Sequence, residues 1–129
     1  MIHLDTSFLI QAIAGVAACE RPVRRWLEQG EELAMSAVAW AEFLCGPLGP
    51  TEHQLAIRFI TLRVPLTEQH AALAARLYND TGRRRGSLVD CMIAATAIRS
   101  GASLATANAA DFRRFLEGGL RLVGERGSS

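Results

Sequence analysis

Short apolar runs alternate along this chain with longer stretches in which apolar residues recur at helical spacing. The short runs predict buried strands at 2–4, 33–35, 62–66, 102–105 and 120–123. The longer stretches predict helices at 8–13, 22–29, 37–45, 51–60, 67–81, 87–100 and 111–116. Strands that alternate with helices in this way predict an α/β fold, with a mostly parallel central sheet flanked by helices.

Residues with strong positional preferences mark the ends of these elements. Ser36, Thr51 and Ser87 stand where a side-chain oxygen can cap the first turn of a helix. Pro22 suits the first turn of the second helix, because that position needs no backbone N–H donor. Pro65 removes a donor from the third strand, so we expect that strand near an edge of the sheet.

Length and composition narrow the class of protein. With 129 residues, 50% of them hydrophobic and 21% charged, the chain has the size and composition of one globular domain. We expect that domain to cover 1–124 and a flexible tail to follow at 125–129. The formal net charge of +1 indicates no general attraction to nucleic acid. All 14 basic residues are arginine, which excludes the Walker A loop, Schiff-base chemistry and the Ser–Lys dyad.

The sequence carries no mark of export. The cysteines are odd in number and lack metal-ligand spacing, so we expect small buried hydrophobes in a reducing cytoplasm: Cys19, Cys45 and Cys91. The N-terminus lacks the basic start of a signal peptide, and no apolar run approaches the roughly 20 residues of a membrane span. We therefore expect a cytoplasmic protein with no membrane partner.

Four carboxylates stand at unusual places in these predicted elements. Asp5 ends the first strand, and Asp111 follows the strand at 102–105. Asp90 opens a helix that is otherwise almost entirely apolar, and Glu42 stands mid-helix among apolar neighbours. Taken singly, Asp5 and Asp111 could each be only a helix cap, and Asp90 could only complement its helix dipole. Glu42 caps nothing.

Together, the four acids indicate a cation site. In a parallel α/β sheet the carboxyl ends of the strands line one edge, where ligands bind. Carboxylates gathered there repel one another and must share protons or hold a cation. Oxygen ligands with small polar neighbours suit Mg²⁺ or Mn²⁺, and the neighbours here are Thr6, Ser7, Thr106 and Asn108. Zinc is disfavoured, because no ligand spacing links the histidines, which we expect at the surface or in strands: His3, His53 and His70.

The segments that carry these acids resemble, in their order, the motifs of PIN-domain ribonucleases, most closely the VapC toxins of toxin–antitoxin pairs. The segments are LDTS at 4–7, AEF at 41–43, DCMIAATA at 90–97 and TANAADF at 106–112, and the resemblance covers residues 2–123. It implies a three-layer PIN-like sandwich and an endoribonuclease that depends on Mg²⁺ or Mn²⁺. The family's acidic positions match Asp5, Glu42, Asp90 and Asp111.

The resemblance also implies a mechanism. Asp5 and Asp90 would hold the ion, which activates water for in-line hydrolysis of a structured tRNA, rRNA or mRNA. Glu42 and Asp111 would orient that water. Asn108 stands where many relatives have an aspartate. Its amide oxygen can ligate but adds no charge, so a second ion would bind weakly or only with substrate.

Partners follow from the same resemblance. A VapB-type antitoxin would dock an amphipathic helix in a groove along the helices at 22–29, 36–45 and 51–60, and the protein would form a homodimer. Five arginines lie in loops or short helices near the acidic edge and could contact phosphates: Arg83, Arg84, Arg85, Arg113 and Arg114. We take Arg84, Arg85 and Arg113 as RNA contacts, although these arginines could form only a solvated basic surface. Two alternatives stay open: a non-catalytic binding or scaffold module, and a metal-dependent phosphatase or DNA nuclease.

Overall fold

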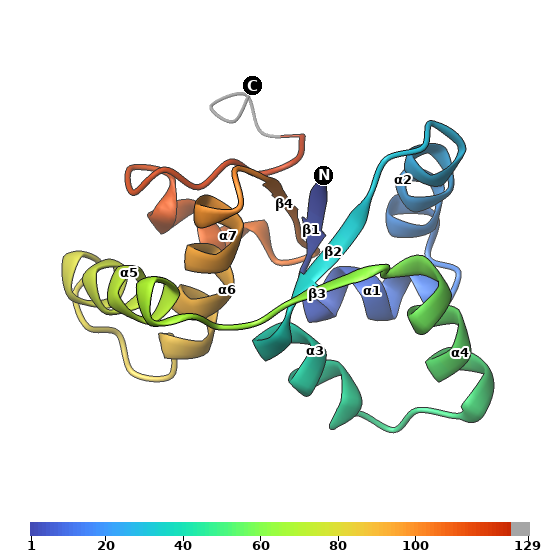
Figure 1. The fold of residues 1–129 in the computed structure, drawn as a ribbon, viewed down its shortest axis with the longest axis horizontal. Coiled ribbons are helices and arrows are strands. Elements are labelled where there is room, and N and C mark those ends of the chain that lie inside the picture. The colour runs from blue at the N-terminus through green and yellow to red at the C-terminus, as the bar shows by residue number, and fades with distance from the viewer. Residues whose placement is uncertain (125–129) are drawn as a thin grey trace.

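The structure of this protein is a computed structural model that describes residues 1–124. Within these residues the core is a four-stranded parallel sheet with the order β3-β2-β1-β4 (Figure 1). The strands are β1 (Ile2–Leu4), β2 (Leu33–Ser36), β3 (Leu62–Val64) and β4 (Ser103–Ala105). The pairing confirms the predicted parallel sheet and puts β3 at an edge, as Pro65 indicates. The predicted tail at 125–129 lies outside the described residues.

Helices cover both faces of the sheet. In the described part of the chain they are α1 (Thr6–Ile13), α2 (Ala17–Glu28), α3 (Ala37–Leu44), α4 (Pro50–Phe59), α5 (Glu68–Asp80), α6 (Leu88–Arg99), α7 (Ala109–Phe112) and a 3-10 turn, η1 (Arg113–Phe115). Figure 1 shows α5, α6 and α7 on one side of the sheet and α1, α2 and α4 on the other. This arrangement confirms the expected three-layer α/β sandwich.

α6 is the buried helix that its apolar sequence predicts. An unbroken run at 93–97 is buried, and it includes three alanines, whose small side chains let neighbouring elements approach closely. Thr96 lies within this run and donates its hydroxyl to the Met92 carbonyl oxygen at 2.8 Å, so its burial leaves no unpaired hydroxyl. Asp90, in the first turn of α6, is only partly buried.

The start of α2 differs from the prediction. The helix begins at Ala17, so Pro22 lies inside it rather than in its first turn. Cys19, Val23 and Trp26 recur at helical spacing and are all buried. Burial of this stripe holds the extra residues in the helix, although Pro22 contributes no N–H donor.

Two of the three predicted caps also need correction. Ser36 caps α3 as predicted, by accepting a backbone N–H of the first turn. α4 begins at a proline directly after its N-cap Gly49, so Thr51 lies inside the helix. Ser87 stands at the N-cap of α6, but its hydroxyl donates to the Arg84 carbonyl oxygen at 2.7 Å instead of capping the helix. That bond closes the loop that leads into α6.

The last predicted strand, at 120–123, shrinks to a single parallel bridge between Leu122 and Leu104. The Leu104 N–H donates to the Arg121 carbonyl oxygen at 2.8 Å, and the Val123 N–H donates to the Leu104 carbonyl oxygen at 2.9 Å. Gly124 follows with a φ of +83°, a conformation that glycine adopts readily.

The cysteines and histidines differ in burial, although the same expectation applied to every member of each residue type. Cys19 and Cys91 are buried as expected, whereas Cys45 is exposed at the C-cap of α3. His70, expected at the surface or in a strand, is buried in α5. Its Nδ1 accepts the backbone N–H of Thr67 at 3.1 Å in a capping box, so the ring has a polar partner and can be buried.

Candidate active site

Asp5 is fixed where β1 passes into α1. Its backbone N–H donates to the Ala105 carbonyl oxygen at 3.1 Å, which ties the end of β1 to β4. Its side chain caps α1 by accepting the backbone N–H of Phe8 at 2.9 Å, and the residue is only 4% exposed. The hydroxyls of Ser7 and Thr106 also donate to the carboxylate, that of Ser7 at 2.8 Å. Asp5 is therefore both a helix cap and an oriented, buried carboxylate.

The loop after β4 is held against the start of α1. The Ala107 N–H donates to the Ser7 hydroxyl oxygen at 3.2 Å, and the Asn108 N–H donates to the Thr106 hydroxyl oxygen at 2.9 Å. Both hydroxyls also donate to Asp5, so each links the loop to the Asp5 carboxylate through hydrogen bonds. This network places Asn108 beside Asp5.

Thr6 links α1 to the acid of α3. Its hydroxyl lies 2.9 Å from the Ala39 carbonyl oxygen and 3.0 Å from Oε1 of Glu42. The cap of α3 is Ser36, so Glu42 has no capping role in its own helix. Contact with Thr6 gives this mid-helix acid a defined place next to the residue that follows Asp5.

These contacts surround a pocket of about 270 Å³ at the carboxyl edge of the sheet. Its lining consists of Asp5, Thr6, Ser7, Ile10, Glu42, Asp90, Ile93, Asn108, Asp111 and Phe112. The lining includes all of the acids that the sequence singles out and three of the small polar neighbours. The other neighbour, Thr106, is not in the lining and acts by donating to Asp5.

Burial shapes the charge of Asp5. Loss of water raises the pKa of its carboxyl above the usual range. Hydrogen bonds from Thr106, Phe8 and Ser7 pull the pKa down, and the nearby Asp111 charge pushes it up again. The net direction is upward, so the ionised form of Asp5 lacks a compensating positive charge.

The pKa of Asp90 is also raised. Burial raises its pKa, and the Arg114 guanidinium lowers it. The other carboxylates of the pocket raise the pKa further, in the order Asp111, Glu42 and Asp5. Because the net shift is upward despite the arginine, a cation placed among these acids would be stabilised.

The donor set suits a hard divalent cation. Carboxylate, hydroxyl and amide oxygens line the pocket, and these are the ligands that Mg²⁺ and Mn²⁺ prefer. Asp5 accepts three hydrogen bonds, and an ionised carboxylate has about four acceptor sites, so it can still offer a lone pair. Within residues 1–124, no three histidine, cysteine or acidic side chains are already gathered as a complete metal cage. The residues of the pocket fit the ion by the type of their oxygen ligands.

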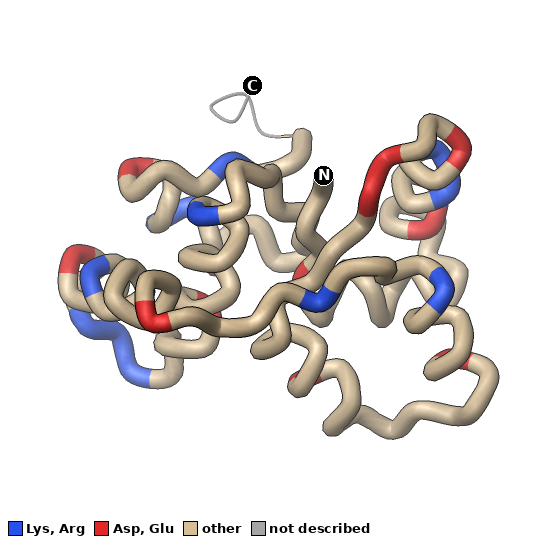
Figure 2. The backbone as a smooth tube through the Cα atoms, viewed as in Figure 1, with Lys and Arg blue, Asp and Glu red and all other residues tan. Residues whose placement is uncertain are grey.

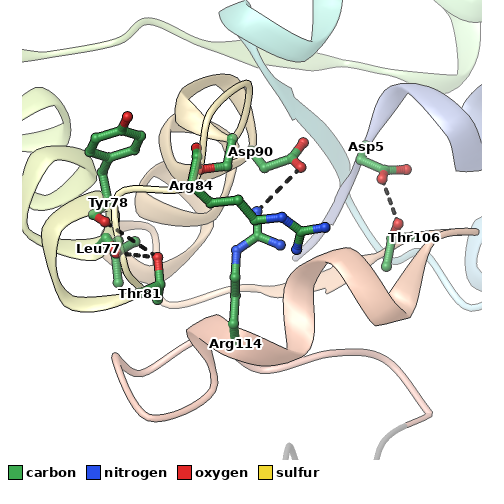
Figure 3. Close-up of polar contacts among 9 residues, drawn as sticks. Asp5, Leu77, Tyr78, Thr81, Arg84, Asp90, Thr106 and Arg114 are labelled. Atoms are coloured by element: carbon green, nitrogen blue, oxygen red, sulfur yellow. Dashed lines mark hydrogen bonds and ion pairs between the residues drawn. The ribbon is translucent and has the colours of Figure 1, made fainter.

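Arg114, one of the arginines expected near the acidic edge, forms an ion pair with an acid of this pocket. Nη2 of Arg114 lies 3.6 Å from Oδ2 of Asp90, and Figure 3 shows its guanidinium pointing at that carboxylate. The neighbouring Arg113 was predicted as an RNA contact, and the ion pair between Arg114 and Asp90 was not predicted. A signal was present, because Phe112 and Phe115 flank the two arginines and both rings are buried. Buried neighbours on either side indicate that one of the arginines turns inward.

The other predicted contacts lie at the surface. Arg84 and Arg85 are exposed in the loop between α5 and α6, which forms a basic stretch in Figure 2. Arg83 turns back from this loop, and its guanidinium donates to the Asn79 side-chain oxygen at 2.9 Å. Arg113 is exposed on η1, two residues after Asp111.

Comparison with known families settles the lineage. The model of the PIN domain matches residues 2–116. The chain belongs to the PIN domain family. PIN domains are nucleases, which hydrolyse phosphodiester bonds, and in this PIN domain the acids of the sequence motifs surround one pocket.

Solved structures share the PIN fold over nearly all of the chain. A toxin–antitoxin complex from Klebsiella pneumoniae is 22% identical, with a TM-score of 0.71 over 98% of this chain and 94% of that one. VapBC2 from Rickettsia felis, bound to a DNA fragment from its promoter, is 18% identical, with a TM-score of 0.73 over 95% and 97%. FitAcB from Neisseria gonorrhoeae is 26% identical, with a TM-score of 0.63 over 88% and 92%. These likenesses confirm the PIN fold of this chain.

A comparison with curated protein sequences gives no match. Among the described residues, no helix has both the length and the apolar character needed to span a bilayer.

Proposed function

We propose that this PIN domain is a metal-dependent endoribonuclease and the toxin of a toxin–antitoxin pair, acting in the cytoplasm on structured RNA. The observation that carries the proposal is the pocket into which Asp5, Glu42, Asp90 and Asp111 converge from separate elements. A scaffold module on the same fold has no need for an acid such as Asp90, whose pKa is raised first by burial and then by repulsion from the other acids of the pocket. Such a pocket is a feature of metal-dependent phosphodiester hydrolysis.

The ion assigned to this pocket is Mg²⁺, with Mn²⁺ as a substitute. Asp5 and Asp90 are the proposed ligands, because they are the two innermost acids and burial raises the pKa of both. When bound, the ion would supply charge neutralisation of the scissile phosphate and a nucleophile at neutral pH. Asn108 adds an amide oxygen without charge, in a place fixed by its N–H bond to Thr106.

The two exposed acids take the roles that need access to water and substrate. Glu42 is held by Thr6, and the N-cap of α7 is Asn108 rather than Asp111, so neither acid serves as a helix cap. We assign them to orient the attacking water and to accept its proton. Phosphate contacts fall to Arg84, Arg85 and Arg113, whose exposed guanidinium groups can reach a nucleic-acid backbone.

The proposed antitoxin site is an apolar groove. Two pockets of about 360 and 370 Å³ lie side by side along α1, α2 and α4, and both are lined by Ile13 and Leu55. Exposed Ile10 and Leu27 extend this apolar surface. An amphipathic helix of a VapB-type antitoxin suits such a groove, and the solved structures that resemble this chain include toxin–antitoxin complexes. We propose a homodimer on the same ground of family likeness.

A substrate panel tests this function. The purified full chain is incubated with tRNA, rRNA, mRNA and matched single- and double-stranded DNA, in Mg²⁺, in Mn²⁺ and in excess EDTA. We expect cleavage of structured RNA with either ion and none in EDTA. Cleavage restricted to DNA would show that the protein is a DNA nuclease instead. Absence of both polymer cleavage and Mn²⁺ binding would favour a scaffold module.

A further inference from the structure

Arg114 holds a fixed position at the rim of the acidic pocket. It belongs to η1, and its side chain is only 17% exposed. The guanidinium lies over the ring of Phe115, 4.5 Å from the ring centroid, and Phe115 is fully buried. An arginine stacked on a buried ring has lost most of its freedom already, so its charge acts from one place.

The guanidinium of Arg114 faces the Asp90 carboxylate but does not form a direct hydrogen bond with it. Nη2 stands 3.6 Å from Oδ2, which is an ion-pair distance longer than a direct hydrogen bond. The Nε atom of Arg114 is buried and has no hydrogen-bond partner within residues 1–124. Incomplete pairing leaves much of this positive charge available to the other acids of the pocket and to an incoming anion.

Two cations therefore compete for the Asp90 carboxylate: the Arg114 guanidinium and the proposed divalent ion. In the free protein Arg114 partly neutralises it, and this cation opposes the repulsion from Asp5, Glu42 and Asp111. A divalent ion that binds Asp90 meets the arginine as a like charge, and the repulsion subtracts from its binding. The low exposure of Arg114 limits how far the guanidinium can swing away to relieve this repulsion.

We propose that Arg114 is a positioning residue that weakens the grip of the acidic pocket on its divalent ion by pairing with Asp90 in the free protein. The inference rests on the proposed function, because it needs Asp90 as a ligand of the ion. A phosphate oxygen of the nucleic acid gives the guanidinium another partner. By linkage, nucleic acid and metal ion then strengthen each other's binding, so the ion loads best when substrate is present.

Isothermal titration calorimetry tests the proposal. The full chain is first freed of metals and is then titrated with Mn²⁺ alone. Arg114→Met removes the charge and keeps an unbranched stem over Phe115. We expect its Kd for Mn²⁺ to fall about tenfold. Arg114→Lys keeps the charge and should stay within about threefold of the wild-type Kd. Arg76→Gln, at an exposed position of α5 outside the pocket, is the matched control and should leave the Kd unchanged.

The outcomes separate this inference from the proposed function. If the wild-type chain binds Mn²⁺ and folded Arg114→Met binds it no more tightly, the inference is overturned and the proposed function stands. If neither protein binds Mn²⁺, the metal-dependent function fails and the inference fails with it. If Arg114→Met does not fold, as judged by circular dichroism, Arg114→Gln is measured and judged by the same criteria.

Discussion

Asp5 and Thr106 are 101 positions apart in the sequence, yet the Thr106 hydroxyl donates a hydrogen bond to the Asp5 carboxylate. β1 pairs with β4 in parallel, with Leu4 opposite Ala105, so the residues that follow the two strands meet. Strand pairing thus places the donor, and the donor orients the innermost acid of the pocket. The fold and the site are coupled at this contact.

Replacing Thr106 with valine should damage both stability and activity. The change keeps the shape of the side chain, but it removes a donor to Asp5 and the acceptor of the Asn108 N–H. We expect the free energy of unfolding to fall by about 1–2 kcal/mol, measured by urea denaturation. RNA cleavage should slow about tenfold or more, because Asp5 is no longer held in one orientation. Thr106→Ser, which retains the hydroxyl, should recover most of both losses, and a fully stable and active valine variant would contradict this account.

Asp90→Asn should raise the melting temperature of the metal-free protein. The pKa of Asp90 is raised in the folded state, so folding favours the protonated form and the ionised form costs stability at neutral pH. Asparagine removes that charge, and we expect Tm to rise by about 2–5 °C in EDTA. Added Mg²⁺ should then stabilise the wild-type chain and leave the variant unchanged. The control is Asp80→Asn, an exposed aspartate at the end of α5, which should respond to Mg²⁺ as the wild type does.

Much of this fold could be predicted because its elements are marked by local chemistry. Short apolar runs identify the strands, and Ser36 identifies the start of α3 because its cap is a local contact. The start of α2 was missed, because burial of Cys19 outweighs the preference of Pro22 for a first turn. The last strand was overestimated, because its pairing with Leu104 depends on a partner distant in sequence.

The candidate site shows the same division. Mid-helix Glu42 among apolar neighbours is visible in the sequence, because an acid there has no local purpose. The ion pair of Arg114 with Asp90 is not visible, because it depends on which of two adjacent arginines turns inward onto Phe115. The burial of His70 escaped for a related reason, since its partner is a backbone N–H in a capping box.

His3 makes the stability depend on pH. The pKa of its ring is lowered from 6.5 to about 4, by burial first and then by the charges of His70 and the N-terminus. His3 therefore binds a proton near pH 6.5 in the unfolded chain, but only at about pH 4 in the folded chain. The free energy of unfolding consequently decreases as the pH falls through this window. We expect a loss of about 2–3 kcal/mol between pH 7 and pH 4.5, measured by urea denaturation. His3→Leu should remove this part of the slope, whereas the exposed His53→Leu should retain it; equal slopes in all three proteins would refute the assignment.

Leu55 offers a test of the proposed antitoxin groove, because it lines both apolar pockets. Leu55→Asp should abolish co-purification with a VapB-type antitoxin that binds the wild-type chain, because a charge would be buried against the partner's apolar face. Ile57→Asp is the matched control, since Ile57 lies on the same helix, is 47% exposed and lines neither pocket. Loss of binding with Ile57→Asp and not with Leu55→Asp would place the antitoxin elsewhere.

The central claim is that carboxylates from separate elements act together on one metal ion in this pocket. The rate of RNA cleavage in Mn²⁺ by Asp90→Asn tests it most directly, measured beside the wild type and Asp80→Asn at matched purity. We predict that Asp90→Asn loses activity about a hundredfold or more while remaining folded, and that Asp80→Asn cleaves at the wild-type rate. Cleavage by Asp90→Asn at the wild-type rate would contradict the account.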